Sequence, residues 1–141
     1  MNLSEIVNQA LEETKSLPKE QVMQVALLAK SRASEKRLQA GTMDFLGEDQ
    51  EITPRQINRA KAYLFTNRIK EIAGCSECEE NTPVCLDFHH EHSKKHHVSY
   101  LANSGRALEA IIPEILKCKI ICSNCHRKHH HPQQKLGGVA F

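Results

Sequence analysis

The sequence predicts a mostly helical α+β protein with a small core that metal ions hold together. All nine histidines and six cysteines of the 141 residues lie between Cys75 and His131. The preceding residues 1–74 contain neither type and instead repeat apolar side chains at the spacing of amphipathic helices. Aromatic residues make up 4% of the chain and Trp is absent, so we expect a small aliphatic core that needs an additional crosslink.

Bulk composition excludes several classes of protein. Hydrophobic residues at 40% and charged residues at 26% are ordinary for a globular domain, and no apolar run approaches the ~20 residues that cross a bilayer. Residues 1–15 carry acidic side chains in place of the apolar region of a signal peptide, so we expect a cytoplasmic protein without a membrane partner. A net charge of +2 excludes a strongly basic nucleic-acid coat, so nucleic-acid binding would need local cationic patches and bound ions.

Residues 1–52 are predicted to form an N-terminal helical extension and a linker. Ser4 is a suitable N-cap for the first helix. Pro18 is tolerated in the first turn of the second helix, which Gly41 would end. Residues 41–52 are rich in glycine and acidic residues, as linkers are. The expected apolar stripes are Leu3, Ile6, Val7, Ala10 and Leu11 in the first helix and Val22, Val25, Leu28 and Ala29 in the second.

A third helix should begin at a capping box. Thr53 and Gln56 have the required spacing, and Pro54 stands at the first helical position. The helix should run to about Ile72 and stop at Gly74. Its cationic face is either solvated or a stripe that contacts phosphates. That face carries Arg55, Arg59 and Lys70.

Residues 53–131 are predicted to form the second domain. Val84 to Phe88 and Lys119 to Ile121 are short strand candidates, because they are rich in β-branched and other apolar residues. Between them, Pro113 should mark the start of a helix, since a proline within a helix costs ~3 kcal/mol. Ser123 to His131 predicts a final short helix, and residues 132–141 a mobile tail.

Two identical half-sites predict a structural zinc ion. Cys75-x-x-Cys78 and Cys122-x-x-Cys125 each place two thiolates on one side of a tight turn, and together they complete a tetrahedron. A redox-active Cys-x-x-Cys is the alternative for either pair alone, but no βαβ pattern surrounds them. Residues 79–121 must then form a small insertion between the half-sites. The two remaining cysteines are expected to be small buried side chains: Cys85 and Cys118.

Four histidines predict a second metal site with a free base beside it. His126 and His130 are spaced i,i+4 on the final helix, so both imidazoles can reach one ion. His89 and His90 follow a strand, and neighbours in a strand point to opposite faces. His89 could therefore complete a three-imidazole site with open positions, while His90 acts as a base. The others suit a solvated surface, although His129 could also meet the ion: His92, His96, His97, His129 and His131.

Taken in order, these motifs resemble the HNH endonucleases, in the zinc-stapled form common in phage and bacterial genomes. The resemblance covers about residues 70–131 and does not extend to residues 1–52. It implies a ββα-metal (His-Me finger) core and places the protein in the cytoplasm of a bacterial or phage-infected cell. The motifs are Cys75-x-x-Cys78, Leu86-Asp87-Phe88-His89-His90, the run KCKIICSNCHR from Lys117 to Arg127, and His130.

The resemblance also implies roles for individual residues. His89, His126 and His130 would bind the catalytic divalent ion, which could be Mg²⁺, Mn²⁺, Ni²⁺ or Zn²⁺, and His90 would activate water. The reaction would be hydrolysis of DNA phosphodiester bonds, by nicking or by double-strand cleavage. The four cysteines of the two half-sites would hold the structural zinc.

The family's central Asn has no counterpart between Glu114 and Lys119. Another group must therefore hold the ring of His90, for example a backbone carbonyl of the strand before Cys122. The nearest cations to the site are Lys94, Lys95, Arg127 and Lys128. Of these, Arg127 could clamp a phosphate bidentately.

Three functions remain open at the level of sequence. The first is a metal-dependent DNA endonuclease or nickase. The second is a catalytically inactive, zinc-stapled nucleic-acid-binding module that uses Arg55, Arg59 and Lys70. The third is a protein-interaction domain or homodimer built on the N-terminal helices.

Overall fold

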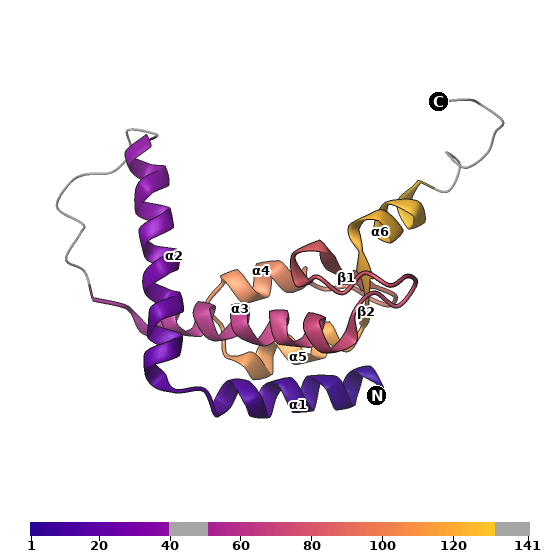
Figure 1. Ribbon diagram of the computed structural model, residues 1–141, viewed down its shortest axis with the longest axis horizontal. Coiled ribbons are helices and arrows are strands. Elements are labelled where there is room, and N and C mark those ends of the chain that lie inside the picture. The colour runs from indigo at the N-terminus through magenta and orange to yellow at the C-terminus, as the bar shows by residue number, and fades with distance from the viewer. Residues whose placement is uncertain (40–50, 132–141) are drawn as a thin grey trace.

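The computed structural model describes residues 1–39 and 51–131 and confirms a mixed α+β protein that is mostly helical (Figure 1). The predicted stop at Gly41, most of the predicted linker and the predicted tail at 132–141 lie outside the described residues. Within the described part of the chain, no helix is both long enough and apolar enough to span a membrane. The elements are α1 (Leu3–Lys15), α2 (Lys19–Gln39), α3 (Pro54–Ala73), β1 (Leu86–His90), α4 (Val98–Asn103), α5 (Leu108–Ile115), β2 (Cys118–Cys122) and α6 (Ser123–His130).

Local capping signals set the starts of α1 and α3. The predicted capping box of α3 is confirmed, because Thr53 Oγ1 accepts from the Gln56 N–H and the Gln56 side chain accepts from the Thr53 N–H. For α1 the prediction was wrong by two residues. Asn2, not Ser4, is the N-cap, and its side chain accepts from the Glu5 N–H at 2.9 Å. Asn and Ser cap helices about equally well, so residue preference alone does not distinguish the two positions.

The buried stripe of α2 differs from the predicted one. Val22 and Ala26 are buried against Ala60 of α3, whereas Leu28 is 58% exposed and Ala29 is exposed. Helical periodicity predicts that one face is apolar. Which of two overlapping stripes is buried depends on the direction from which α3 approaches, and the sequence of α2 does not encode that direction.

A two-stranded antiparallel sheet carries the histidine pair. β1 pairs with β2 in a register that places Leu86 opposite Cys122 and His90 opposite Cys118. The first strand was predicted two residues too early. Pro83 begins a 3-10 turn that ends at Cys85, and Val84 is 87% exposed there. Helices α4 and α5 form the insertion between the strands.

Pro113 lies inside α5 and does not begin it, which corrects the prediction. The helix starts at Leu108, so proline removes one backbone hydrogen bond from the middle of an eight-residue helix. Burial of the apolar face of α5 offsets this cost, because each fully buried aliphatic side chain contributes about 1.5–3 kcal/mol. The residues of that face are Leu108, Ile111 and Ile115.

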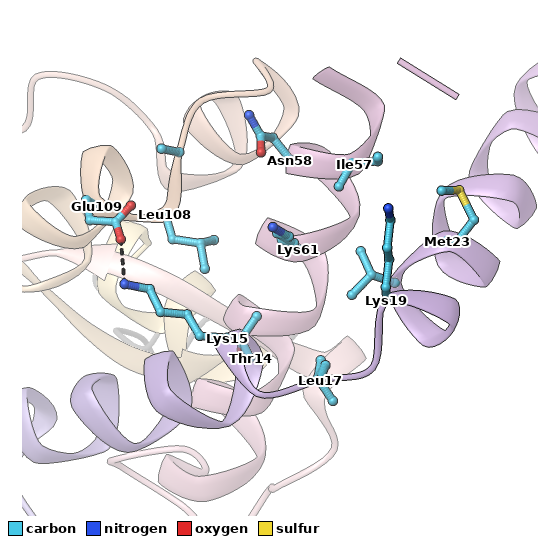
Figure 2. A pocket seen from close by; sticks show the side chains of 12 residues that line it. Thr14, Lys15, Leu17, Lys19, Met23, Ile57, Asn58, Lys61, Leu108 and Glu109 are labelled. Carbon is cyan, nitrogen blue, oxygen red and sulfur yellow. Dashed lines mark ion pairs between the residues drawn. The ribbon is translucent and has the colours of Figure 1, made fainter. Parts of the chain in front are cut away.

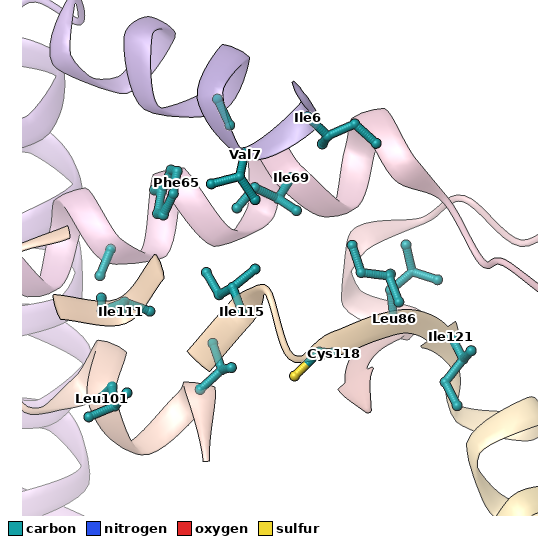
Figure 3. Packing of buried hydrophobic residues seen from close by; sticks show 14 of the residues in the cluster. Ile6, Val7, Phe65, Ile69, Leu86, Leu101, Ile111, Ile115, Cys118 and Ile121 are labelled. Atoms are coloured by element: carbon teal, nitrogen blue, oxygen red, sulfur yellow. The ribbon is translucent and has the colours of Figure 1, made fainter. Parts of the chain in front are cut away.

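One hydrophobic core joins the N-terminal helix to the sheet (Figure 3). Val7 of α1 packs in the same cluster as Phe65 and Ile69 of α3, and all three are almost fully buried. Ile115 of α5 and Ile121 of β2 belong to this cluster as well. Helix α1 is therefore part of the packed unit that holds the sheet.

Candidate metal centres

The four cysteines of the half-sites converge at the junction of α3, β2 and α6. Cys75 follows Gly74, whose positive φ of 64° ends α3. Cys122 ends β2, and Cys125 lies in the first turn of α6. One Sγ from each of Cys75, Cys78, Cys122 and Cys125 lies within 4.8 Å of the others. The two half-sites are therefore brought together as the spacing predicts.

The geometry and chemistry of this cluster suit a metal ion that is coordinated tetrahedrally by four thiolates. Cys78 Sγ and Cys122 Sγ are 3.6 Å apart, and a zinc tetrahedron with Zn–S bonds of 2.3 Å has an edge of about 3.8 Å. Burial raises the pKa of Cys75, but N–H donors of Glu77 and Cys122 outweigh it and lower the pKa to about 6. Contact with the Cys122 thiol raises the pKa of Cys125 to about 12. A divalent cation would stabilise all four as thiolates, so the cluster could bind a structural metal ion.

Three imidazoles form a second group of possible ligands. His89 of β1 meets His126 and His130 of α6, and one ring nitrogen of each lies within 4.8 Å of the others. The two Nε2 atoms of α6 are 3.0 Å apart, close to the edge of about 3.3 Å that a tetrahedral zinc–imidazole site requires. Burial, followed by the neighbouring histidines, lowers the pKa of His89, which favours the neutral, ligating form.

A carboxylate orients one of these rings. Asp87 and His89 are two residues apart in β1, so their side chains lie on the same face of the sheet. Asp87 Oδ2 lies 3.2 Å from Nδ1 of His126, so the Nε2 of that ring is directed to the other histidines. Carboxylates in this position are common behind metal-binding histidines. Asp87 was not identified as a site residue from the sequence, although it lies in the predicted strand, two residues before His89.

His129, which the sequence left open as a ligand, has a different partner. Its ring stacks on His89 at 5.2 Å, but its Nε2 lies 2.8 Å from Glu77 Oε1. Glu77 belongs to the first cysteine turn and also contacts Lys119 at 3.3 Å. The His129 hydrogen bond lowers the pKa of Glu77. His129 therefore ties α6 to the cysteine cluster and is not one of the three converging imidazoles.

The ring of His90 lies on the opposite face of β1 from His89. Its side chain is 9% exposed, and its Nε2 lies 3.2 Å from Glu114 Oε1 of α5. The group that holds this ring is therefore a carboxylate and not the backbone carbonyl that the sequence suggested. The available signal was an acidic residue flanked by the aliphatic residues Ile112 and Ile115. Glu114 is 5% exposed, which is rare for a glutamate.

The predicted cations do not form one continuous surface. Arg55 and Arg59 are exposed near the start of α3, about 22–28 Å along the helix axis from Gly74. Lys70 lies over the Phe88 ring at 5.2 Å, and burial lowers its pKa. Arg127 and Lys95 are exposed, and the Lys95 N–H is bound to Glu114. Arg127 therefore follows a candidate ligand directly, while Arg55 and Arg59 form a separate group.

The two remaining cysteines, Cys85 and Cys118, are not members of the four-cysteine cluster. Burial raises the pKa of Cys118 to about 12, as expected for an inert buried thiol, and Cys85 is partly buried.

A cavity of about 510 Å³ lies where the α1–α2 turn meets α3 and the start of α5 (Figure 2). Lys15, Lys19 and Lys61 line it together with Glu109, which pairs with Lys15 at 2.8 Å. It shares no lining residue with either candidate metal centre.

Comparisons with known proteins do not assign a family to this chain. No family model, no curated protein and no solved structure matches it. The function must therefore be argued from the two candidate metal centres and the side chains around them.

Proposed function

We propose that the protein is a metal-dependent DNA endonuclease or nickase of the HNH type. The observation that carries the proposal is the convergence of His89, His126 and His130. Three neutral imidazoles leave coordination positions open, which is typical of catalytic rather than structural metal sites. The order β1, β2, α6 around this group is the arrangement that a ββα-metal core would need.

The two candidate centres would divide structure from chemistry. The four-cysteine cluster would hold zinc and connect the end of α3 to the start of α6. The Cys122 side chain also caps α6 by accepting from the Cys125 N–H at 3.4 Å. Because α6 carries both His126 and His130, a zinc ion in the cluster would fix the direction of the helix that supplies two catalytic ligands.

In the proposed reaction, each nearby residue has a defined task. A divalent ion held by the three histidines would supply a Lewis acid that neutralises charge on the scissile phosphate. His90 would take the proton of the attacking water. Asp87 would keep His126 oriented, and Arg127 would bind a phosphate oxygen of the DNA backbone. The bond from phosphorus to the 3′-oxygen would break as the new bond to the water oxygen forms, and the 3′-oxygen would take up a proton from solvent water.

The proposal is tested with supercoiled plasmid and a panel of Mg²⁺, Mn²⁺, Ni²⁺ and Zn²⁺. The wild type should convert the plasmid to open-circle or linear DNA with at least one of these ions. His90→Ala should abolish conversion while zinc content and DNA binding stay unchanged. If the wild type leaves the plasmid intact with every ion, the nuclease proposal is wrong.

A binding module without cleavage is the second candidate. The observation that favours it is the exposed pair Arg55 and Arg59, which lies far from the three histidines and could hold a phosphate backbone. DNA binding that falls on Arg59→Ala, in a wild type that never cleaves, would support this reading.

A further inference from the structure

Glu114 is a buried carboxylate whose two oxygens contact four nitrogen atoms. Oε1 accepts from the N–H of Lys95 at 2.8 Å and of His96 at 3.2 Å, and it lies 3.2 Å from Nε2 of His90. Oε2 accepts from Lys117 Nζ at 3.0 Å. The side chain thereby ties the chain that leaves β1, the ring of His90 and the segment before β2 to one helix.

This environment keeps the carboxylate ionised. Burial alone would raise the pKa of Glu114, but three hydrogen-bond donors outweigh this effect: the N–H of Lys95, the ammonium of Lys117 and the N–H of His96. The pKa is lowered to about 2. An ionised carboxylate can only accept hydrogen bonds, so the Nε2 atom of His90 that faces it must carry a hydrogen.

The second nitrogen of the ring is consequently the free one. Within residues 1–39 and 51–131, Nδ1 of His90 forms no hydrogen bond. No buried side-chain nitrogen or oxygen of the described chain lacks a partner, so Nδ1 retains access to solvent. With the hydrogen on Nε2, Nδ1 presents a lone pair that can accept a proton.

We propose that Glu114 is the positioning residue of the general base: it holds the Nε2–H of His90 and presents Nδ1 to the attacking water. This inference rests on the proposed nuclease function for its catalytic meaning. The contact joins residues 24 positions apart, on β1 and α5. It also fixes the backbone of the loop that carries Lys95, so one carboxylate places both the base and an exposed cation beside it.

The test combines a spectroscopic signature with cleavage kinetics on the full chain loaded with zinc. Long-range ¹H–¹⁵N correlation should show the hydrogen of His90 on Nε2, as a resonance that exchanges slowly with water. Glu114→Ala should abolish that resonance. The same substitution should lower kcat about 10- to 100-fold with KM unchanged. Glu114→Gln keeps an oxygen for the two loop N–H groups and for the Nε2–H of His90, so it should fold with normal zinc content, keep the resonance and retain most of the kcat that Glu114→Ala loses.

Lys117→Met is the matched control, because it removes a partner of the same carboxylate but leaves the Oε1 contact in place. It should keep the slowly exchanging resonance and change kcat by less than about threefold. A hydrogen on Nδ1, a resonance that survives Glu114→Ala, full kcat in folded Glu114→Ala, or a folded Glu114→Gln without the resonance would each overturn the inference. If the wild type cleaves nothing, the nuclease proposal fails and the catalytic role with it, while the resonance still decides whether Glu114 holds the ring.

Discussion

Asp87 Oδ2 lies 3.2 Å from Nδ1 of His126, across the interface between β1 and α6. This contact leaves Nε2 of the same ring 3.0 Å from Nε2 of His130. The carboxylate thus selects which nitrogen of His126 is available to an ion. Because Asp87 and His89 share one face of β1, a single strand supplies both a candidate ligand and the group that orients another.

Asp87→Ala should weaken metal binding at the three histidines about 10- to 100-fold, because the His126 ring loses the group that fixes its tautomer. Titration of zinc-loaded protein with Ni²⁺, followed by calorimetry, measures this binding apart from the cysteine cluster. Asp87→Asn should have a smaller effect, since its amide oxygen still accepts a hydrogen bond. Equal Ni²⁺ affinity in wild type and Asp87→Ala would contradict the orienting role.

His130→Ala and His129→Ala form a matched pair on one helix. His130→Ala removes a converging imidazole, so Ni²⁺ binding and plasmid nicking should both be lost. His129→Ala removes a ring that is bound to Glu77, so both properties should remain, with a small loss of stability. The opposite pattern would show that His129 replaces His130 as the ligand when an ion is present.

Features encoded within a few residues could be predicted from the sequence. The capping box at Thr53, the two Cys-x-x-Cys turns and the i,i+4 pair of His126 and His130 each depend on local geometry alone, and the structure has all of them. The second strand also follows from its own apolar composition. Its predicted core, Lys119 to Ile121, lies within β2.

Features that depend on distant packing could not be predicted. The contact of Glu114 with His90 exists because α5 folds back onto the end of β1, which no local pattern specifies. The same is true of Pro113, which is tolerated in mid-helix only because its helix has a buried face. The exposure of Leu28 likewise follows from how α3 meets α2.

Cys122→Ser should destabilise the protein strongly, whereas Cys118→Ser should not release zinc. Cys122 is a member of the four-thiol cluster, and loss of one thiolate ligand weakens a structural zinc site and the folding energy coupled to it. Cys118 is equally buried, but its Sγ lies outside the cluster and donates to the Glu114 carbonyl at 3.3 Å. Zinc content by elemental analysis and thermal melting separate the two variants. A folded, zinc-loaded Cys122→Ser would refute the structural role of the cluster.

The stability that Glu114 contributes should disappear in acid. Burial alone would raise its pKa, but hydrogen bonds from Lys95, Lys117 and His96 outweigh this effect and lower the pKa from 4.5 to about 2. A lowered pKa means that the contribution is present above pH 4.5 and is lost as the pH falls toward 2. Glu114→Gln cannot titrate. The difference in free energy of unfolding between wild type and Glu114→Gln should therefore shrink over this range.

Denaturant unfolding at several pH values measures that difference. Because acid releases zinc from both proteins alike, the comparison between them isolates the carboxylate. A difference that stays constant from pH 5 to pH 2 would mean that Glu114 is not ionised in the folded protein.

Helix α1 should be required for folding of the entire described unit. Val7 is 1% exposed and packs in one cluster with Phe65, Ile69 and the sheet residue Ile121. Val7→Ala should lower the free energy of unfolding by about 1–3 kcal/mol, because it removes buried methyl groups and leaves a cavity. Val84→Ala is the control with the same chemistry. Val84 is 87% exposed, so its loss should change stability by less than about 0.5 kcal/mol.

Denaturant unfolding, followed by zinc content, distinguishes an integral α1 from a separate extension. If α1 is integral, Val7→Ala should shift the unfolding of the cysteine and histidine centres together with that of the helices, in one transition. An unchanged midpoint for zinc release would instead mean that residues 1–52 fold apart from the metal centres. Only in that case would deletion of residues 1–52 be a clean test of partner binding or oligomerisation, because otherwise the deletion exposes Phe65 and Ile69 and unfolds the candidate sites.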